Sequence, residues 1–208
     1  MEIETRVLIT RLQPYSESSF IAYGLSSEYG LLHFLASGER RVSKKQFPTL
    51  ALFREIDLTL YRNDKNEDGL FKVRKLELTQ HFDSLANKIK AYEYAIWACD
   101  FINRNTTEQQ QFPLLYSLLR HSFDEYHKQE NTAAWQCAIL VNFMAEEGLL
   151  PGANELNELQ TKILEELLMC SVHHSPLPEL KDKQWQQLLN WASQVLQFQH
   201  YYIPQLQF

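Results

Sequence analysis

Residues 11–45 read RLQPYSESSFIAYGLSSEYGLLHFLASGERRVSKK, and this stretch decides the fold of the first part of the chain. It holds two short apolar runs, Ser19 to Leu25 and Leu31 to Ala36, which are separated by Ser-Ser-Glu-Tyr-Gly. Runs this short and rich in Phe, Ile and Tyr, bounded by Ser and Gly, are typical of β-strands. A loop with two arginines and two lysines follows the second run. We therefore expect a strand, a turn and a second strand, and then a basic loop that an anionic ligand can reach.

Further strand signals flank this hairpin on both sides. Residues 6–15 are expected to form the first strand, with Val7 and Ile9 on one face and Leu8 and Thr10 on the other. Residues 50–62 alternate cleanly between apolar and polar side chains, the period of a half-buried strand. Residues 70–78 change parity, because the phenylalanine and valine near their start occupy odd positions and the two leucines near their end occupy even ones. Such a switch indicates a β-bulge, here near Arg74 and Lys75.

These five short strands follow one another without a helical pattern between them, which fits a small five-stranded β-barrel. An oligonucleotide-binding barrel and an SH3-like barrel give almost the same periodicity, so the pattern alone leaves both open. After Asp83 the apolar side chains recur at spacings of three and four, which is typical of helices. The spacing predicts five helices, at residues 83–104, 113–126, 132–147, 154–170 and 182–200.

The expected helices carry their own end signals. Asp83 or Ser84 is placed to cap the first helix, Pro113 opens the second, and Gly148 follows the third. An apolar stripe along a helix is typical of its buried face. For the first helix, the stripe consists of Leu85, Ile89, Tyr92, Ile96 and Cys99.

Three short motifs near the N-terminus carry a resemblance to a known family. They are Tyr15-x-Glu17-Ser18 before one strand, Glu28-Tyr29-Gly30 before the next, and Gly38-x-Arg40-Arg41 with Lys44 after it. In this order and spacing they resemble the N-terminal domain of the RecO family, bacterial recombination mediators that act in DNA repair. The resemblance implies an α+β chain, with an oligonucleotide-binding barrel at residues 1–80 that contacts DNA and a helical domain at residues 81–208 that binds partners.

The resemblance also implies a function without bond chemistry. RecO proteins are DNA repair and recombination accessory proteins, which promote strand annealing and help to load recombinase. The implied partners are single- or double-stranded DNA, the acidic C-terminal tail of single-stranded-DNA-binding protein, and RecR. Neutralising the phosphates of two strands lowers their repulsion and so favours pairing. The alternative is a divergent protein-interaction module of the same fold whose barrel no longer binds nucleic acid, which the overall net charge of −6 favours.

Charge is distributed unevenly along the chain. Residues 1–77 hold 12 Lys+Arg against 11 Asp+Glu, whereas residues 78–208 hold 8 against 15, so an anionic ligand is expected on the first part. The candidate DNA-binding cations are Arg6, Arg11, Arg40, Arg41, Lys44, Lys45, Arg62, Lys72 and Arg74. Aromatic side chains that can stack on bases, if exposed, are Tyr15, Tyr23, Tyr29 and Phe47. The alternative is that these are solvated charges and core aromatics.

A partner site is expected on the second helix. The acidic tail that the resemblance implies ends in an apolar residue, so it needs an apolar groove with a basic side chain at its mouth. One helix can supply both, through Leu115, Leu118, Leu119 and Arg120. The alternative is an ordinary core stripe beside one exposed arginine, and the excess acid of this part of the chain also opposes an acidic partner.

Signals for metal or catalytic chemistry are weak. Cys170-x-x-His173-His174 has ligand-like spacing but lacks a fourth ligand, so a buried cysteine beside exposed loop histidines is the simpler interpretation. Many RecO proteins carry a four-cysteine zinc module after the third helix, and here Leu149-Leu-Pro-Gly-Ala leads directly into the fourth. The chain has no Walker P-loop, Gly-x-Ser-x-Gly or His-Glu-x-x-His motif. We therefore expect no metal, no cofactor and no enzymatic activity.

Two compositional features bear on the cellular compartment. The N-terminal Met-Glu-Ile-Glu-Thr-Arg lacks the apolar core of a signal peptide, and no run approaches the ~18 apolar residues of a membrane helix. The three cysteines are widely spaced within apolar helical patterns, which predicts reduced and buried thiols. A cytoplasmic protein without a membrane partner is expected.

Overall fold

The computed structural model describes residues 2–37, 49–62 and 70–205, and these divide into two compact units. The first unit comprises Met1–Asp83 together with Thr106–Gln111. The second comprises Ser84–Asn105 and Phe112–Phe208. Because the two stretches of the second unit are separated in sequence by Thr106–Gln111, the chain returns to the first unit once before it continues.

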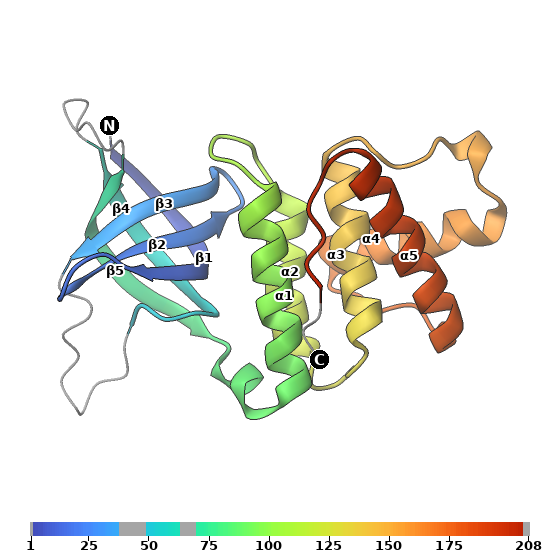
Figure 1. The fold of residues 1–208 in the computed structure, drawn as a ribbon, viewed down its shortest axis with the longest axis horizontal. Helices are drawn as coiled ribbons and strands as arrows, with labels where there is room; N and C mark the ends of the chain where they lie inside the picture. Colours follow the sequence, from blue (N-terminus) through green and yellow to red (C-terminus); the bar gives the residue numbers. More distant parts are fainter. Residues whose placement is uncertain (1, 38–48, 63–69, 206–208) are drawn as a thin grey trace. The chain divides into compact units, whose positions relative to one another are not determined.

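The first unit is a closed β-barrel (Figure 1). Its strands are β1 (Glu2–Pro14), β2 (Ser19–Ser26), β3 (Gly30–Ser37), β4 (Arg54–Tyr61) and β5 (Phe71–His81). They follow the order β1-β2-β3-β5-β4, and β4 returns to β1 to close the barrel. All pairs are antiparallel except β3 with β5. This strand order, with its one parallel pair, is that of an oligonucleotide-binding barrel. It therefore decides against the SH3-like barrel, which the periodicity had left open.

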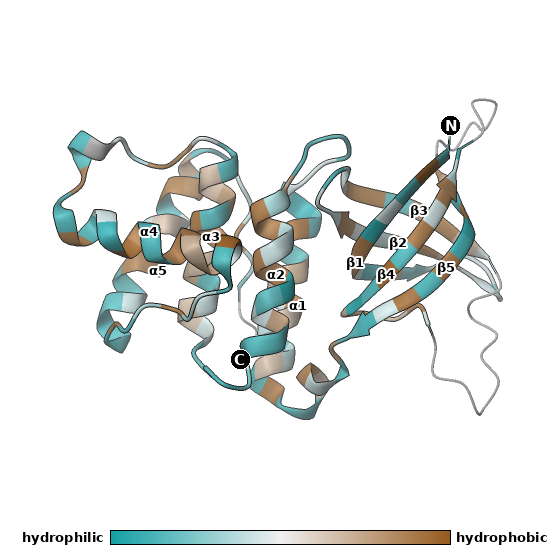
Figure 2. Ribbon diagram, turned by 180° about the vertical axis from the view of Figure 1, so that it is seen from behind, coloured by the Kyte–Doolittle hydropathy of each residue, from teal (hydrophilic) through white to brown (hydrophobic). Residues whose placement is uncertain are grey.

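Alternation along the strands fills the barrel interior. Val7, Ile9, Phe34 and Leu60 are completely buried in one apolar cluster, whereas their neighbours Arg6, His33 and Tyr61 are at least partly exposed. Figure 2 shows bands of colour along the strands. The predicted bulge in β5 is confirmed: the register with β4 shifts where Arg74 is inserted. The change of parity in the sequence is the direct result of this extra residue.

Residues 106–111, which we call the strap, pair with the turn between β2 and β3. The Leu31 amide donates to the Thr107 carbonyl at 3.1 Å, and the Gln109 amide donates to the Tyr29 carbonyl at 3.1 Å. Gly30 lies between them with φ +69°, and a Cβ there would lie 2.3 Å and 2.4 Å from two strap carbonyl oxygens. Only glycine fits this position, because both its backbone conformation and its surroundings exclude a side chain.

The second unit is helical. Its α-helices are α1 (Ile89–Asn105), α2 (Pro113–Glu125), α3 (Thr132–Glu146), α4 (Glu158–His173) and α5 (Asp182–Phe198). Short 3-10 helices, η1 (Asp83–Asn87) and η2 (Ala153–Glu155), precede α1 and α4, so these two helices begin later than their sequence patterns predicted. Gly148 has φ +69° just after α3, which confirms the predicted helix end. Among the described residues, no helix is long and apolar enough to cross a membrane.

Helix α3 lies at the centre of the helical core, with every residue from Ala134 to Met144 buried. The Phe143 ring meets Phe101 edge-on at 5.1 Å between centroids, stacks on Phe112 at 6.0 Å, and meets Tyr201 edge-on at 5.0 Å. Aromatic packing from four segments therefore joins the helices around one residue.

The apolar stripe predicted for the first helix lies largely on the wrong face. Ile89, Tyr92 and Ile96 are exposed by 77%, 43% and 38%, and only the remaining members of the stripe, Leu85 and Cys99, are buried. The core-facing side of α1 instead consists of Ala91, Tyr94, Ala95, Trp97, Ala98, Phe101 and Ile102. Three alanines on this side let the helix approach its neighbours closely, which leaves space for the large aromatic rings.

The first turn of α2 is capped from another helix. Its N-cap residue, Phe112, makes no side-chain cap, and Pro113 has no amide hydrogen. The Glu146 carboxylate at the end of α3 accepts instead from the Leu114 amide at 2.7 Å and from the Leu115 amide at 3.2 Å. Burial raises the pKa of Glu146 to about 7, although both hydrogen bonds act in the opposite direction.

Candidate nucleic-acid interface

The predicted DNA-binding cations fall into two groups. Arg40, Arg41, Lys44 and Lys45 lie outside the described residues, as does the aromatic Phe47. The described members, Arg6, Arg11, Arg62, Lys72 and Arg74, all belong to the barrel unit. Their strand register decides which of them are brought together.

The outer face of β1, β4 and β5 carries charges of both signs. Arg6 donates two hydrogen bonds to Asp57 of the neighbouring strand, at 2.7 Å and 3.0 Å, and this contact lowers the pKa of Asp57. Arg74 donates to Glu2 at 2.7 Å. Lys75 lies 2.9 Å from its strand neighbour Glu77. Because each of these cations already contacts a carboxylate, the described part of this face is not a continuous positive stripe.

The outer face of β1, β2 and β3 has a different character. Strand register aligns Arg11 with Tyr23 and Tyr23 with His33, so the three side chains form one row across the sheet. The Arg11 guanidinium lies 5.0 Å from the centre of the Tyr23 ring, and the Tyr23 and His33 rings are 4.5 Å apart with a 60° tilt. A cation over an aromatic ring and two neighbouring rings form a surface on which a planar group can stack.

A second row on the same face extends this surface. Gln13, Ile21 and Leu35 are aligned with one another, and Leu35 is aligned with Lys72 of β5. Ile21 and Leu35 are half-buried although they point away from the barrel interior. We call the outward side chains of both rows the stacking face: Arg11, Gln13, Ile21, Tyr23, His33, Leu35 and Lys72. Within the described part of the chain, neither Arg11 nor Lys72 has a carboxylate partner.

His33 is a member of the stacking face that sequence analysis did not identify. Burial lowers its pKa, and it does so more strongly than the nearby Glu108 carboxylate raises it, so the neutral imidazole is favoured at neutral pH. Its Nε2 is buried and has no hydrogen-bond partner among the described residues. No sequence motif marks His33, and only the strand register reveals that it adjoins Tyr23.

The other predicted aromatic side chains are placed differently. Tyr15 is 61% exposed at the turn between β1 and β2, where it can extend the surface offered to a ligand. Tyr29 packs against the barrel core instead. Among the described aromatic candidates, Tyr15 and Tyr23 are therefore the ones available for stacking.

The partner groove predicted on α2 is not found there. Leu115, Leu118 and Leu119 are completely buried in the helical core, and Arg120 is half-buried. These leucines pack inward because α2 contacts both α3 and α4, which leaves them no surface for a partner. The three leucines thus form an ordinary core stripe, which was the alternative interpretation of this pattern.

A hollow lined by apolar side chains, one cation and the two carboxylates Glu93 and Asp100 lies on α1. The exposed Ile89, Tyr92 and Ile96 line it together with Tyr202 and Arg104, and its volume is about 690 Å³. The Arg104 guanidinium lies 4.3 Å from the centre of the Tyr202 ring and contacts Asp100 of its own helix at 2.9 Å. The chemistry predicted for α2, an apolar groove beside a basic residue, therefore occurs on the face of α1 that the sequence pattern assigned to the core.

The segment after α5 forms the other wall of this hollow. Asn105 and Tyr202 exchange two hydrogen bonds, at 2.7 Å and 2.8 Å, through the Asn105 side chain and the Tyr202 backbone. The Trp97 indole donates to the Pro204 carbonyl at 2.8 Å. The wall is thus attached to α1 by directional bonds as well as by packing.

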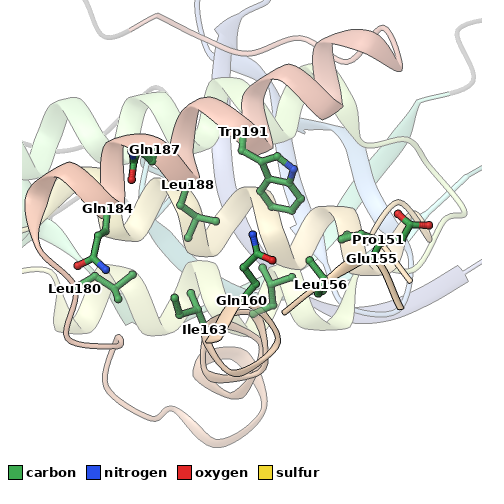
Figure 3. A pocket seen from close by; sticks show the side chains of 11 residues that line it. Pro151, Glu155, Leu156, Gln160, Ile163, Leu180, Gln184, Gln187, Leu188 and Trp191 are labelled. Atoms are coloured by element: carbon green, nitrogen blue, oxygen red, sulfur yellow. The ribbon is translucent and has the colours of Figure 1, made fainter. Parts of the chain in front are cut away.

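A smaller hollow of about 490 Å³ lies between α4 and α5 (Figure 3). Its walls combine apolar and polar side chains, with Ile163, Leu188 and Trp191 among the apolar ones that point into it. Two of its glutamines, Gln160 and Gln184, accept from the backbone amides of the residues that precede α4 and α5. Apolar walls beside oriented amide groups suit a ligand with an apolar body and a polar edge.

The Cys170-x-x-His-His segment is held by local contacts. The Cys170 thiol is buried and donates to the carbonyls of Glu166 and Pro176. His173 and His174 are both exposed, as predicted, and His174 also stacks on His121 at 4.8 Å and contacts the Ser117 hydroxyl at 3.2 Å. The three side chains therefore have separate surroundings. All three cysteines of the chain are free and buried, as predicted.

Comparisons with known proteins agree with the barrel. The family model described as Recombination protein O N terminal matches residues 1–82. A DNA repair protein RecO of Listeria monocytogenes serotype 4b (strain CLIP80459) is 25% identical over 137 residues, which cover 64% of this chain and 52% of that protein. The RecO of Halalkalibacterium halodurans is 25% identical over 112 residues, or 54% and 42% of the two chains.

A relative with lower sequence identity covers a similar share of the chain. The DNA repair protein RecO of Caldanaerobacter subterraneus is 21% identical over 122 residues, which cover 59% of this chain and 48% of that protein. The chain thus spans about half the length of the curated relatives that it matches. Residues 1–82, which form the barrel, are thus similar to the N-terminal domain of RecO proteins.

Proposed function

We propose that this protein is a DNA repair accessory protein whose barrel binds single-stranded DNA on the stacking face. The observation that carries the proposal is the row of Arg11, Tyr23 and His33 across three strands. Every base has a planar face, so stacking on aromatic rings gives affinity without a sequence requirement. The names of the relatives, DNA repair protein RecO, support a nucleic acid as the ligand.

The charges of the barrel favour a single strand over a duplex. A duplex is held chiefly through its phosphates, and affinity then increases with the number of cations that engage them. Arg6 and Arg74 already contact carboxylates, whereas the stacking face offers rings and apolar side chains beside only two cations, Arg11 and Lys72, without a carboxylate partner in the described part of the chain. Exposed bases, which a duplex does not present, match this surface better.

Binding of this kind supports the wider role that the resemblance implies. A strand held beside Arg11 and Lys72 has its backbone partly neutralised, which lowers the repulsion that opposes annealing. Annealing, loading of recombinase and recruitment of RecR and single-stranded-DNA-binding protein are accordingly part of the proposal. The basic loop that contains Arg40 and Lys44 is an additional predicted contact to phosphates.

Fluorescence anisotropy with a labelled single-stranded oligonucleotide tests the proposal. Since stacking is worth about 1–3 kcal/mol per base, Tyr23→Ala is expected to weaken binding by about 5- to 150-fold. Arg11→Ala should also weaken binding, and by a factor that shrinks as salt is added. Arg6→Ala is the matched control, because this arginine of the same strand is paired with Asp57 on the other face.

Two results would contradict the assignment. If Arg6→Ala weakens binding as much as Arg11→Ala, the charged face of β1, β4 and β5 is the site. If the wild-type protein fails to bind even at low salt, the barrel is a protein-interaction module without nucleic-acid binding, which is the alternative function.

We propose further that the hollow on α1 receives the acidic C-terminal tail of single-stranded-DNA-binding protein. The apolar end of such a tail fits among Ile89, Tyr92 and Ile96, and its terminal carboxylate can accept from Arg104. A labelled acidic peptide that ends in an apolar residue provides the probe. Arg104→Ala should weaken its binding, whereas Arg120→Ala should not. If Arg120→Ala weakens binding and Arg104→Ala does not, the peptide binds at α2 instead.

A further inference from the structure

The hollow between α4 and α5 combines apolar walls with a polar rim (Figure 3). Its apolar lining residues are buried or half-buried, whereas its four polar ones, Glu155, Gln160, Gln184 and Gln187, are exposed. Its volume of about 490 Å³ lies within the range of about 300–1,000 Å³ that is usual for ligand sites. A ligand that enters the hollow covers the half-buried apolar side chains, which removes apolar surface from water.

Two glutamines of this hollow present fixed hydrogen-bond donors. Gln160 Oε1 accepts from the Asn157 amide at 3.0 Å, and Gln184 Oε1 accepts from the Lys181 amide at 2.9 Å. Because both partners are backbone N–H groups, each carboxamide oxygen is the accepting atom, and each NH2 group remains for another partner. Within the part of the chain that the structure describes, neither NH2 group has a hydrogen-bond partner. Each of the two helices therefore supplies one donor to the hollow (Figure 3).

Glu155 gives the hollow a negative charge. All the lining residues belong to the described part of the chain, and Glu155 is the one among them that is charged at neutral pH. No cation of the described residues contacts its carboxylate. The surrounding sequence has the same sign, since residues 78–208 hold 8 Lys+Arg against 15 Asp+Glu. Charge therefore favours a cationic ligand both at the hollow and at longer range.

We propose that the hollow between α4 and α5 binds an extended, basic peptide segment of a protein partner. Apolar side chains of the segment lie against Trp191 and its apolar neighbours, and a lysine or arginine pairs with Glu155. The backbone carbonyls of the segment accept from the two glutamine NH2 groups. An extended segment suits these donors because its carbonyls are available, whereas a helix engages most of its own carbonyls internally.

This site goes beyond the proposed function and differs from both surfaces assigned there. The hollow on α1 includes the cation Arg104, and we assigned it an acidic peptide. The hollow between α4 and α5 has no cation among its lining residues, all of them described, and it carries the Glu155 carboxylate instead. The two hollows thus select peptides of opposite charge, so one peptide does not serve both.

NMR titration of the isotope-labelled full chain with two synthetic peptides tests the inference. Both peptides are capped at their ends and contain two leucines, and they differ only because two lysines in the first are replaced by glutamates in the second. Two tryptophans serve as reporters, because Trp191 lines the hollow between α4 and α5 and Trp97 lines the hollow on α1. The lysine peptide should shift the indole N–H signal of Trp191, which Trp191→Phe assigns, and leave that of Trp97 unchanged. It should bind roughly 5-fold more tightly than the glutamate peptide at low salt.

Glu155→Gln tests the charge of the hollow. It should weaken binding of the lysine peptide roughly 2- to 5-fold, because it removes the carboxylate that pairs with a lysine. Glu165→Gln is the matched control, since it removes an exposed carboxylate of α4 that does not line the hollow. Equal weakening in both variants would overturn the assignment of Glu155, because it would reflect net charge alone.

Gln160→Glu tests the donors. The new carboxylate can still accept from the Asn157 amide and so keeps the cap of α4, but it has no NH2 group to donate. This variant should bind the lysine peptide about 2- to 10-fold more weakly, although its added negative charge alone would strengthen binding. Gln197→Glu is the matched control, because it makes the same change at an exposed position of α5 outside the hollow. Gln184→Glu provides a second variant if Gln160→Glu does not fold, which thermal unfolding checks.

Three further results would overturn the inference. The first is a Trp191 signal that does not move at millimolar concentrations of the lysine peptide. The second is equal affinity for the two peptides, which would show that apolar contact alone drives binding. The third is a response confined to Trp97, which would place the lysine peptide in the hollow on α1. None of these results depends on binding of nucleic acid by the barrel, so this inference and the proposed function fail separately.

Discussion

The Glu146 cap gives a quantitative prediction for the helical unit. Glu146 accepts from the Leu114 and Leu115 amides, which are the first available donors of α2 after Pro113. Loss of a helix N-cap costs about 0.5–2 kcal/mol, and loss of a negative charge at a helix N-terminus costs about 0.3–1 kcal/mol. Burial raises the pKa of Glu146, so it outweighs the gain from the charge. The cap hydrogen bonds remain, and we expect Glu146→Ala to lower the free energy of unfolding by about 1–2 kcal/mol.

The expected change is large enough to measure by thermal or urea denaturation followed by circular dichroism. In a chain of this size, each kcal/mol lowers the Tm by about 2–4 °C, so Glu146→Ala should lower it by about 2–8 °C. Glu165→Ala is the matched control, because Glu165 is an exposed carboxylate within α4 and gives no cap. A Tm of Glu146→Ala equal to that of the control would refute the cap.

The pKa of Glu146 adds a dependence on pH. Since its folded pKa of about 7 lies above its ordinary value of 4.5, the folded state binds more protons than the unfolded state between these values. The stability that Glu146 contributes is therefore fully present below the unfolded pKa and decreases as the pH rises through the folded one. The cost of Glu146→Ala should be greater at about pH 5 than at about pH 8. If the cost of Glu146→Ala grows with pH instead, burial is not the main influence on the pKa of Glu146.

Three further variants test other features of the fold. Gly30→Ala should destabilise the barrel by about 2 kcal/mol or more in urea denaturation, whereas Gly148→Ala, with the same φ but open space, should cost only about 1 kcal/mol, and equal costs would contradict the contact with the strap. Phe143→Ala should cost about 3–5 kcal/mol, and a cost below about 1 kcal/mol would show that the surrounding rings close the cavity. Burial and the neighbouring His174 lower the pKa of His121, so the stability that depends on neutral His121 is present above about pH 6.5 and is lost as the pH falls through its lowered folded pKa. His121→Gln should lose less stability than the wild type on acidification, and an equal loss would exclude His121 as the group responsible.

Local signals in the sequence were sufficient to predict much of the fold. The bulge at Arg74 follows from a change of parity that one extra residue must cause, and the end of α3 follows from Gly148. The apolar stripe of α1 was misassigned, because Ile89, Tyr92 and Ile96 have the correct period but face outward. A periodic pattern shows that apolar side chains lie on the same side of a helix. It does not show whether that side faces the core or the solvent.

The candidate site depends on contacts that the sequence does not encode locally. Composition identified Arg6 and Arg11 alike as cations of the first strand. Only the pairing of strands reveals that Arg6 lies opposite Asp57 and that Arg11 lies beside Tyr23. His33 and Glu108 were missed for the same reason, since each becomes part of the site through a residue distant in sequence.

The strap has a consequence for the order in which the protein matures during translation. The ribosome completes β5 at His81, but Thr106–Gln111 emerge only after the whole of α1 has been synthesised. Until then the turn at Gly30 lacks its hydrogen-bonding partners, and the nascent barrel exposes an unpaired strand end. A truncated chain that stops at Asp83 should therefore retain this exposed end permanently, and such edges are prone to aggregation. Expression of the barrel alone should yield less soluble protein than a chain that extends past Gln111.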